Sequence, residues 1–295
     1  MSMSELQKKM KEMMAQVQTS ATSNQGNNDY FKLHTDEQGN GSSIIRFIPQ
    51  PDLTSQPYIE KWSYYFSNPV TGKIYNELSA RTFGEKDVLG QFNSWLYNQG
   101  AEDRYRQQKA KRRFFSNIYV IKHPGKSDDE GQVKVFGFGV KIFDKIKNIL
   151  FPDESLGDRP VNPFDVINGV NLRLKTKKVG GYANYDDSIF DMTPTPLADT
   201  EAEIMSIIES GHELNTLIDK SKLKDTETEI KALDSVFGPA DDLWNEFKKQ
   251  AGYDVFDTHV EAKPIKESTP EPVKPKKQTK PVDDIDIDDI INSLG

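Results

Sequence analysis

A cluster of positive charges lies near the middle of the chain. Residues 104–122 include seven Lys and Arg and no Asp or Glu. Tyr105, Phe114, Phe115 and Tyr119 are interleaved with them. Proteins hold single-stranded nucleic acid by neutralising phosphates with cations and by stacking bases on aromatic rings, at about 1–3 kcal/mol per stacked base. The stretch therefore indicates a surface for single strands. A solvated basic loop beside an ordinary buried strand is the alternative.

A second cluster of the same kind lies further along the chain. Arg173, Lys175, Lys177 and Lys178 lead into residues 180–185, which include two glycines and two tyrosines. Glycine allows another backbone to approach closely, and the tyrosines adjoin the positive charge. Alone this signal is weak, but it supports the first cluster.

The charge is divided unevenly along the chain. The net charge is −8, yet residues 30–178 carry 23 Lys and Arg against 17 Asp and Glu. Residues 179–295 carry 12 against 26, and 25 of the 30 aromatic residues lie between residues 30 and 190. This asymmetry favours polyanion binding by the first part and contact with the same chain or a partner by the second.

Composition excludes several kinds of protein. No apolar run reaches the roughly 20 residues of a membrane helix, so we expect a soluble protein. The first residues lack an apolar run with a small-residue cleavage site, which argues against a secretory signal. Cysteine is absent, so neither a disulfide nor a cysteine-ligated zinc ion holds the fold together.

The pattern of short apolar runs predicts a mixed fold. β-rich runs bounded by turn residues predict strands at residues 30–33, 43–48, 116–121, 133–138 and 170–176. Helical spacing predicts helices at residues 141–150, 201–209, 226–237 and 241–250. Short strands with a few helices are typical of an α+β protein with a small barrel-like core.

Both ends of the chain differ from the middle. Residues 4–18 have the spacing of an amphipathic helix, and a Ser/Thr/Asn/Gly segment at residues 19–28 separates them from the core. We interpret this arm as a docking helix for a neighbouring subunit, with a disordered terminus as the alternative. Residues 263–281 have the Lys/Glu/Pro composition of a disordered linker.

The acidic C-terminus has a pattern of its own. Its last 13 residues contain no Lys or Arg and five aspartates, which alternate with isoleucines: Asp283, Asp284, Asp286, Asp288 and Asp289. So acidic a segment cannot pack alone, but it can imitate a phosphate backbone or fold onto a partner. A solubilising tail is the alternative.

Five motifs in a fixed order carry a family resemblance. They are NG followed by IRFIP at residues 40–49, the basic run leading into FFSNI at 114–118, EGQV at 130–133, FGVKIFDKI at 138–146 and GYANYD at 181–186. Together they resemble the single-stranded DNA-binding (helix-destabilising) proteins of T-even-type bacteriophages.

The resemblance implies a domain organisation. Residues 30–257 would form an oligonucleotide-binding (OB) fold β-barrel core, with an accessory subdomain at about 62–100 and helices at about 197–252. Residues 1–29 would be an arm whose basic residues Lys8, Lys9 and Lys11 mediate cooperativity between neighbouring subunits. Residues 258–295 would be a linker and an acidic tail that covers the groove without DNA. The tail would recruit replication and recombination proteins: polymerase, primase-helicase, helicase loader and recombinase.

The resemblance also implies groove residues. Its aromatic positions fall on Tyr97, Tyr105, Phe114, Phe136 and Tyr185, and its basic run falls on Lys109, Lys111 and Arg112, with Arg113 adjacent. The two basic clusters add Arg104, Arg106, Arg173, Lys175, Lys177 and Tyr182. One aromatic position of the family falls on Lys86, where a charge replaces a stacking contact.

The zinc site of the family has no counterpart here. Well-characterised members hold the accessory subdomain together with one His and three Cys, but residues 64–92 contain neither. We therefore predict no metal and no other cofactor. A set of aromatic residues would pack the subdomain instead: Trp62, Tyr64, Tyr65, Phe66, Tyr75, Phe83 and Phe92.

The sequence thus predicts a non-enzymatic protein that binds single-stranded DNA cooperatively and without sequence specificity. It would act in phage replication, recombination and repair, in the cytoplasm of the infected bacterium. One alternative is a Mg²⁺-dependent nuclease built on the doublets at residues 128–129, 186–187 or 241–242. Another is an RNA-binding translational repressor, since stacking surfaces accept both nucleic acids.

Overall fold

The computed structural model describes residues 28–253, which divide into two compact units. The first unit comprises residues 28–60 and 113–217, and the second comprises residues 61–112 and 218–253. Strands β2 (Tyr58–Ser67) and β4 (Lys111–Lys122) each pass from one unit into the other. The acidic tail and almost all of the N-terminal arm lie outside the described residues.

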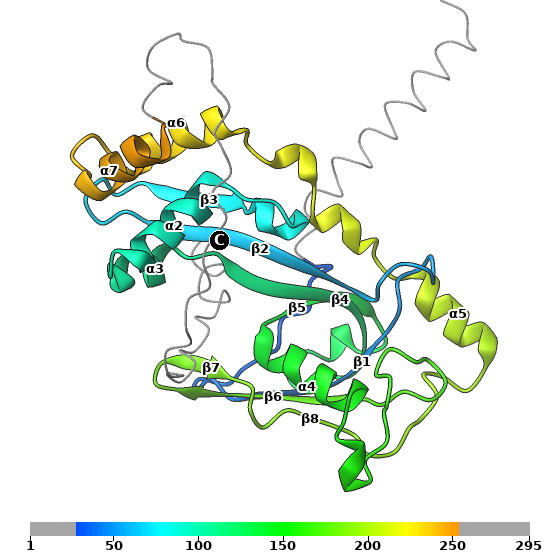
Figure 1. Ribbon diagram of the computed structural model, residues 1–295. Helices are drawn as coiled ribbons and strands as arrows, with labels where there is room; N and C mark the ends of the chain where they lie inside the picture. The colour runs from blue at the N-terminus through cyan, green and yellow to red at the C-terminus, as the bar shows by residue number, and fades with distance from the viewer. Residues whose placement is uncertain (1–27, 254–295) are drawn as a thin grey trace, which may run out of the picture. The chain divides into compact units, whose positions relative to one another are not determined.

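The first unit is built on an antiparallel sheet (Figure 1). In it, β1 (Gly41–Phe47) pairs with β4 on one side and with β6 (Leu172–Val179) on the other. The remaining strands are β5 (Val133–Phe138), which pairs with β4, and β7 (Tyr182–Asn184) and β8 (Ile189–Phe190), which pair with β6. Its helices are α4 (Val140–Leu150) and α5 (Glu201–Glu209), with 3-10 turns at Ser127–Asp129, Glu154–Leu156 and Leu214–Leu217.

The core of the first unit forms from every second residue of its strands. Phe47 lies opposite Ile118, and Ile45 lies opposite both Val120 and Leu172. All five are fully buried, and the apolar stripe of α4 packs against the same cluster. Because strand side chains alternate between two faces, the residues between them face away from this core.

The α+β class is confirmed, but the predicted closed barrel is not. Over the described residues the strand path β3-β2-β4-β1-β6-β7 has two ends that do not pair. The outer edge of β5 is occupied by the incoming chain, since the Phe31 amide donates to the Val135 carbonyl at 2.8 Å and the Val135 amide donates to the Asp29 carbonyl at 2.8 Å. The predicted strand at residues 30–33 is therefore reduced to an isolated bridge at Tyr30.

The second unit packs helices against a hairpin. The hairpin joins β2 to β3 (Ile74–Leu78) and runs from the pair Ser63 and Leu78 to the pair Ser67 and Ile74. Around it gather α2 (Val88–Asn98), α3 (Glu102–Gln108), α6 (Thr226–Phe237) and α7 (Asp242–Ala251), with 3-10 turns η2 (Ala80–Phe83) and η6 (Lys220–Lys222). Helices α6 and α7, distant in sequence, therefore complete this unit.

Aromatic rings dominate the core of the second unit. Four of the predicted packing residues are buried in it, namely Tyr64, Phe66, Tyr75 and Phe92, whereas Trp62, Tyr65 and Phe83 are half-buried. Helices α6 and α7 contribute Phe237, Trp244 and Phe247 to the same cluster. The ring of Phe92 lies 5.1 Å from those of Trp244 and Phe247, measured between centroids. An aromatic core that recruits C-terminal helices thus holds this unit together.

A carboxylate joins three segments at the start of α2. Asp87 caps the helix by accepting from the Gly90 amide at 2.7 Å. It also accepts from the Tyr64 hydroxyl at 2.7 Å, the Ser79 hydroxyl at 2.6 Å and the Ala80 amide at 2.9 Å. One ionised side chain therefore links β2, η2 and α2, and charge-assisted hydrogen bonds are the stronger kind.

A second carboxylate reaches the same helix end from α6. Glu229 accepts from the Val88 amide at 2.9 Å and from the Leu89 amide at 3.1 Å. Burial raises the pKa of Glu229, while these two hydrogen bonds oppose that rise. A carboxylate at a helix N-terminus is also favoured by the helix dipole. The contact ties α6 to α2 across the sequence.

We expect Asp87→Ala to lower the free energy of unfolding by about 2–4 kcal/mol, because it removes a helix cap and leaves buried donors without an acceptor. Urea denaturation followed by circular dichroism measures this. The matched control is Asp225→Ala, which removes the exposed cap of α6 and is expected to cost clearly less. Equal losses for the two variants would contradict a special role for Asp87.

Candidate nucleic-acid interface

The outward face of β6 carries three of the predicted cations. Every second residue of this strand is buried, so alternation turns Arg173, Lys175 and Lys177 towards solvent. Arg173 pairs with Asp191 at 2.5 Å and Lys177 with Asp187 at 2.8 Å. The hydrogen bond that Lys177 donates to Asp187 raises the pKa of Lys177, whereas Lys175 forms no ion pair with any described residue. Exposed ion pairs are weak, so a phosphate can displace these carboxylates.

The turn after β6 presents an aromatic ring beside the cations. Gly180 and Gly181 adopt φ values of 60° and 92°, which only glycine reaches without strain, and the chain reverses there. Tyr182 follows with 47% of its surface exposed. Tyr185 is instead half-buried and packs against the core of the first unit. The structure thus makes Tyr182 the more accessible of the two predicted tyrosines.

Two predicted stacking residues are core residues. Phe114 is fully buried, and its ring stacks on that of Phe143 with centroids 3.8 Å apart. Phe136 is 6% exposed and lies against Phe31 and Phe138. Neither ring has a face left for a base. The structure therefore places Phe114 and Phe136 in the core rather than at the interface.

Phe115, and not the predicted Phe114, is the phenylalanine of β4 that points away from the core. It lies one residue further along β4, so it points away from the core on the same face as Arg113. Its ring crosses Gly137 on β5, where an added Cβ would come within 2.8 Å of it. The Arg113 guanidinium donates to the Gly137 carbonyl at 3.2 Å. The sequence contained a signal for this orientation. Counting back from Ile118 in steps of two residues places Phe114 on the core face and Phe115 on the opposite face.

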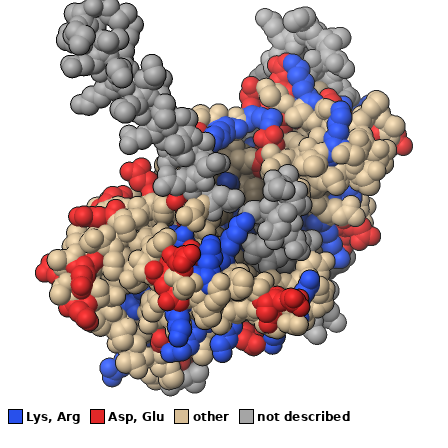
Figure 2. All heavy atoms as spheres, turned by 180° about the vertical axis from the view of Figure 1, so that it is seen from behind, with Lys and Arg blue, Asp and Glu red and all other residues tan. Residues whose placement is uncertain are grey.

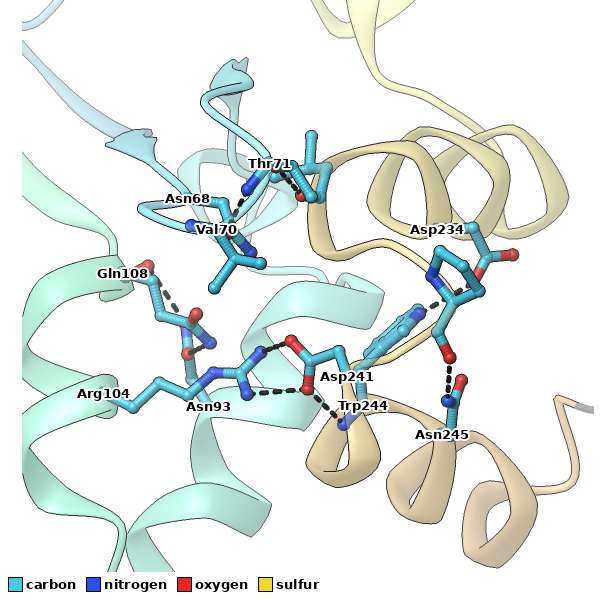
Figure 3. A network of polar contacts seen from close by, with 12 residues as sticks. Asn68, Val70, Thr71, Asn93, Arg104, Gln108, Asp234, Asp241, Trp244 and Asn245 are labelled. Carbon is cyan, nitrogen blue, oxygen red and sulfur yellow. Dashed lines mark hydrogen bonds and ion pairs between the residues drawn. The ribbon is translucent and has the colours of Figure 1, made fainter.

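Arg104 has a structural role in the second unit. Both of its terminal nitrogens donate to the Asp241 carboxylate, at 2.8 and 2.6 Å (Figure 3). Its guanidinium also lies 5.0 Å from the ring of Phe92 and 4.9 Å from that of Phe237. Asp241 in turn caps α7 by accepting from the Trp244 amide at 3.0 Å. Arg104, which the sequence predicted to bind phosphate, therefore joins α3 to α7.

The other predicted residues of α3 and its flanks differ in accessibility. Tyr97 is 58% exposed, and its ring lies edge-on to the half-buried Tyr105 with centroids 5.5 Å apart. Arg106 forms an exposed i,i+4 pair with Glu102 at 2.8 Å. Lys109 is exposed and makes no ion pair with a described residue. Tyr97 and Lys109 are therefore the accessible members of this group.

The basic run at residues 111–113 belongs to a strand rather than to a loop. Strand β4 begins at Lys111, earlier than predicted. Within the second unit the Lys111 ammonium lies 6.0 Å from the ring of Tyr65, and the Arg112 guanidinium lies 5.6 Å from that of Trp62. These contacts hold the two cations over aromatic rings, and they fix the directions in which the Lys111 and Arg112 side chains point.

The acidic doublets considered for Mg²⁺ are engaged by cations. Asp129 pairs with Lys134 at 3.2 Å and Asp186 with Lys141 at 3.3 Å, and Asp241 pairs with Arg104. Within residues 28–253 no group of three or more His, Asp or Glu side chains is arranged to hold a metal ion.

Two wider features complete the description. On the face drawn in Figure 2, groups of Lys and Arg side chains lie close to groups of Asp and Glu. No helix among the described residues has the length and apolar character needed to cross a membrane. Lys8, Lys9, Lys11 and the five tail aspartates lie outside the described residues, so their roles stay predictions.

Comparison with known proteins gives the family. The model of the gp32 DNA binding protein like family matches residues 39–237. The chain belongs to this family. It is 33% identical over 215 residues to the single-stranded DNA-binding proteins of Enterobacteria phages T4 and T2, and the alignments span 71% of this chain and 70% of each relative. The matched residues 39–237 include both basic clusters.

We expect Arg104→Gln to lower the free energy of unfolding by about 2–4 kcal/mol, because it leaves the mostly buried Asp241 carboxylate unpaired. The salt dependence of DNA binding should stay that of the parent. Urea denaturation and a salt titration measure the two quantities. Arg106→Gln, on the same helix, is the control, and its exposed pair predicts a change of less than about 0.5 kcal/mol. If Arg104→Gln has the stability of the parent but a shallower dependence of DNA binding on salt, Arg104 contacts DNA and the structural role is wrong.

Proposed function

We propose that this protein coats single-stranded DNA cooperatively and with little sequence preference. It would serve phage DNA replication, recombination and repair as a non-enzymatic protein in the cytoplasm of the infected bacterium. Two relatives in the same family carry the name single-stranded DNA-binding protein. The observation that carries the proposal is the solvent-facing row Arg173, Lys175 and Lys177, with exposed Tyr182 at its end. Such a row follows a phosphate backbone while the ring accepts a base.

The proposal extends to the organisation of the chain. The core at residues 30–257 is of the oligonucleotide-binding type, with the outer faces of β4 and β6 as its binding surfaces. The second unit contributes two further accessible residues, Tyr97 of the accessory subdomain at about 62–100 and Lys109. Residues 1–29 act as the cooperativity arm and residues 258–295 as linker and tail.

The rival functions have less support. Asp129 and Asp241 are largely buried and held in ion pairs, which leaves them few of the open ligand positions that a Mg²⁺ nuclease needs. Outward cations and rings bind single-stranded RNA as well. The names of the two relatives favour DNA, which is therefore the ligand we propose.

The double variant Lys175→Gln/Lys177→Gln should weaken binding of poly(dT) and flatten its salt dependence. Each lost phosphate contact is expected to reduce the slope of log K against log salt by about 0.7–1. Fluorescence titration at several salt concentrations measures both effects. Lys231→Gln is the control, since Lys231 is exposed and, like Lys177, ion-paired, but lies on α6. If the double variant has the same dependence of log K on log salt as Lys231→Gln, the outer face of β6 does not bind DNA.

Two deletions test the ends of the chain. Removing residues 1–18 should abolish cooperativity and spare the intrinsic affinity for a short oligonucleotide, because the arm contacts a neighbour rather than DNA. Removing residues 283–295 should leave DNA binding equal or stronger and abolish recruitment of replication proteins, because the tail competes for the cationic groove. Isotherms on long and short strands measure the first effect, and pull-down of the phage polymerase measures the second. Unchanged cooperativity without the arm would contradict its role.

A further inference from the structure

A buried group of charged side chains lies where the incoming chain meets β4 and β5 in the first unit. His123, Asp129 and Lys134 are each no more than 2% exposed. His123 follows the end of β4, Asp129 ends the 3-10 turn at Ser127–Asp129, and Lys134 lies on β5. The Asp129 carboxylate lies 3.1 Å from Nδ1 of His123 and 3.2 Å from the Lys134 ammonium. None of these three residues belongs to the proposed DNA surfaces.

The same group holds the first described residues of the chain. Nε2 of His123 accepts from the His34 amide at 2.9 Å, and the Lys134 ammonium donates to the Asn28 carbonyl at 2.7 Å. The buried ring of Phe31 lies 4.9 Å from that of His123, measured between centroids. Residues 28–34 directly follow the part of the chain that contains the predicted cooperativity arm. The group therefore holds the chain at the base of that arm.

The contacts of His123 require a neutral ring. Because Nε2 accepts a hydrogen bond from a backbone amide, the ring proton lies on Nδ1, which donates it to Asp129. A second proton on Nε2 would face the N–H of His34, and both groups would then be donors. Protonation of His123 therefore breaks the contact with His34.

The surroundings of His123 favour this neutral state. Charged or titratable groups surround it from its own turn, from β5 and from the incoming chain: Lys126, Asp129, Glu130, Lys134 and His34. The two lysines pair with Asp129, at 3.3 and 3.2 Å. Burial lowers the pKa of His123, and the hydrogen bond to Asp129, which acts in the opposite direction, does not offset this. The bound ring therefore takes up a proton less readily than a free histidine does.

We propose that His123, Asp129 and Lys134 form a pH-sensitive clasp that positions the base of the N-terminal arm. Neutral His123 keeps the clasp closed on residues 28–34, and proton uptake opens it as the pH falls through the ordinary titration range of histidine. This inference rests on the proposed function of the arm and adds positioning residues to it. Opening would lengthen the tether between arm and core, which lowers the effective concentration of the arm at a neighbouring subunit.

Amide hydrogen exchange of residues 28–34 tests the clasp without DNA. From about pH 7.5 to about pH 5.5, opening should become about tenfold more favourable, because the released ring takes up a proton that the bound ring does not. The rates are corrected for the intrinsic pH dependence of exchange. In His123→Gln the side-chain amide can accept from His34 and donate to Asp129 without titrating, so the rise should disappear.

Two other histidines supply matched controls. His212 is half-buried in the same unit, and its backbone rather than its ring bonds to Asn117, so His212→Gln should respond to pH as the parent does. His34→Gln should also respond, which excludes titration of the exposed His34 ring. Lys134→Met removes the bond to Asn28 and should raise the exchange of residues 28–34 at both pH values, with urea denaturation to check that it folds.

Binding to poly(dT) tests the positioning role. Opening extends the tether from about 10 to about 16 residues, so cooperativity at the lower pH should fall about twofold in the parent relative to His123→Gln. Affinity for a short oligonucleotide should be the same for the two proteins. Lys134→Met should show the lower cooperativity at both pH values.

The outcomes separate this proposal from the broader one. If His123→Gln responds to pH as the parent does, or if exchange rises while cooperativity does not change, the clasp proposal fails and the proposed function stands. If removing residues 1–18 leaves cooperativity unchanged, the proposed function of the arm fails, and the positioning role fails with it.

Discussion

The alternation of side chains along β4 and β6 is the constraint on which the interface depends. Burying one residue in two closes the core of the first unit, and it turns the intervening residues to the opposite face of the strand. On β6 those residues are Arg173, Lys175 and Lys177, and on β4 they include Arg113 and Phe115. A shift of either strand by one residue would bury the cations and expose the core. The stability of the core and the position of the binding surface are therefore set by the same register.

The segments of the second unit are joined by contacts that involve no cysteine or histidine side chain. A metal site joins segments by placing several side chains around one ion. Here the Asp87 carboxylate receives four donors from three segments, and Glu229 adds the connection to α6. The aromatic core supplies the apolar burial that such a hydrogen-bonded centre lacks. The same arrangement fixes the turn from which Arg81 extends.

Ion pairs divide the cations into two kinds. Arg104 is held by a mostly buried carboxylate and two rings, so releasing it would leave an unpaired charge inside the unit. Arg173 and Lys177 are themselves exposed, the first beside the half-buried Asp191 and the second beside the exposed Asp187, and an exposed ion pair contributes little, so another anion can replace it. Charge in the sequence therefore does not identify a phosphate ligand until the burial of its partner is known.

Local patterns in the sequence determined a large part of this protein. Apolar spacing located β5, α5 and α6 at their observed bounds, and ordered motifs identified the family, because both signals reside in neighbouring residues. The two-residue period counted from Ile118 also predicts that Phe114 is buried while Phe115 faces the other side, whereas tertiary structure alone decided that Arg104 meets Asp241 and that Arg81 stacks on Trp62. Those outcomes depend on strand register and on contacts between residues far apart in the chain. Composition and local periodicity do not encode such contacts.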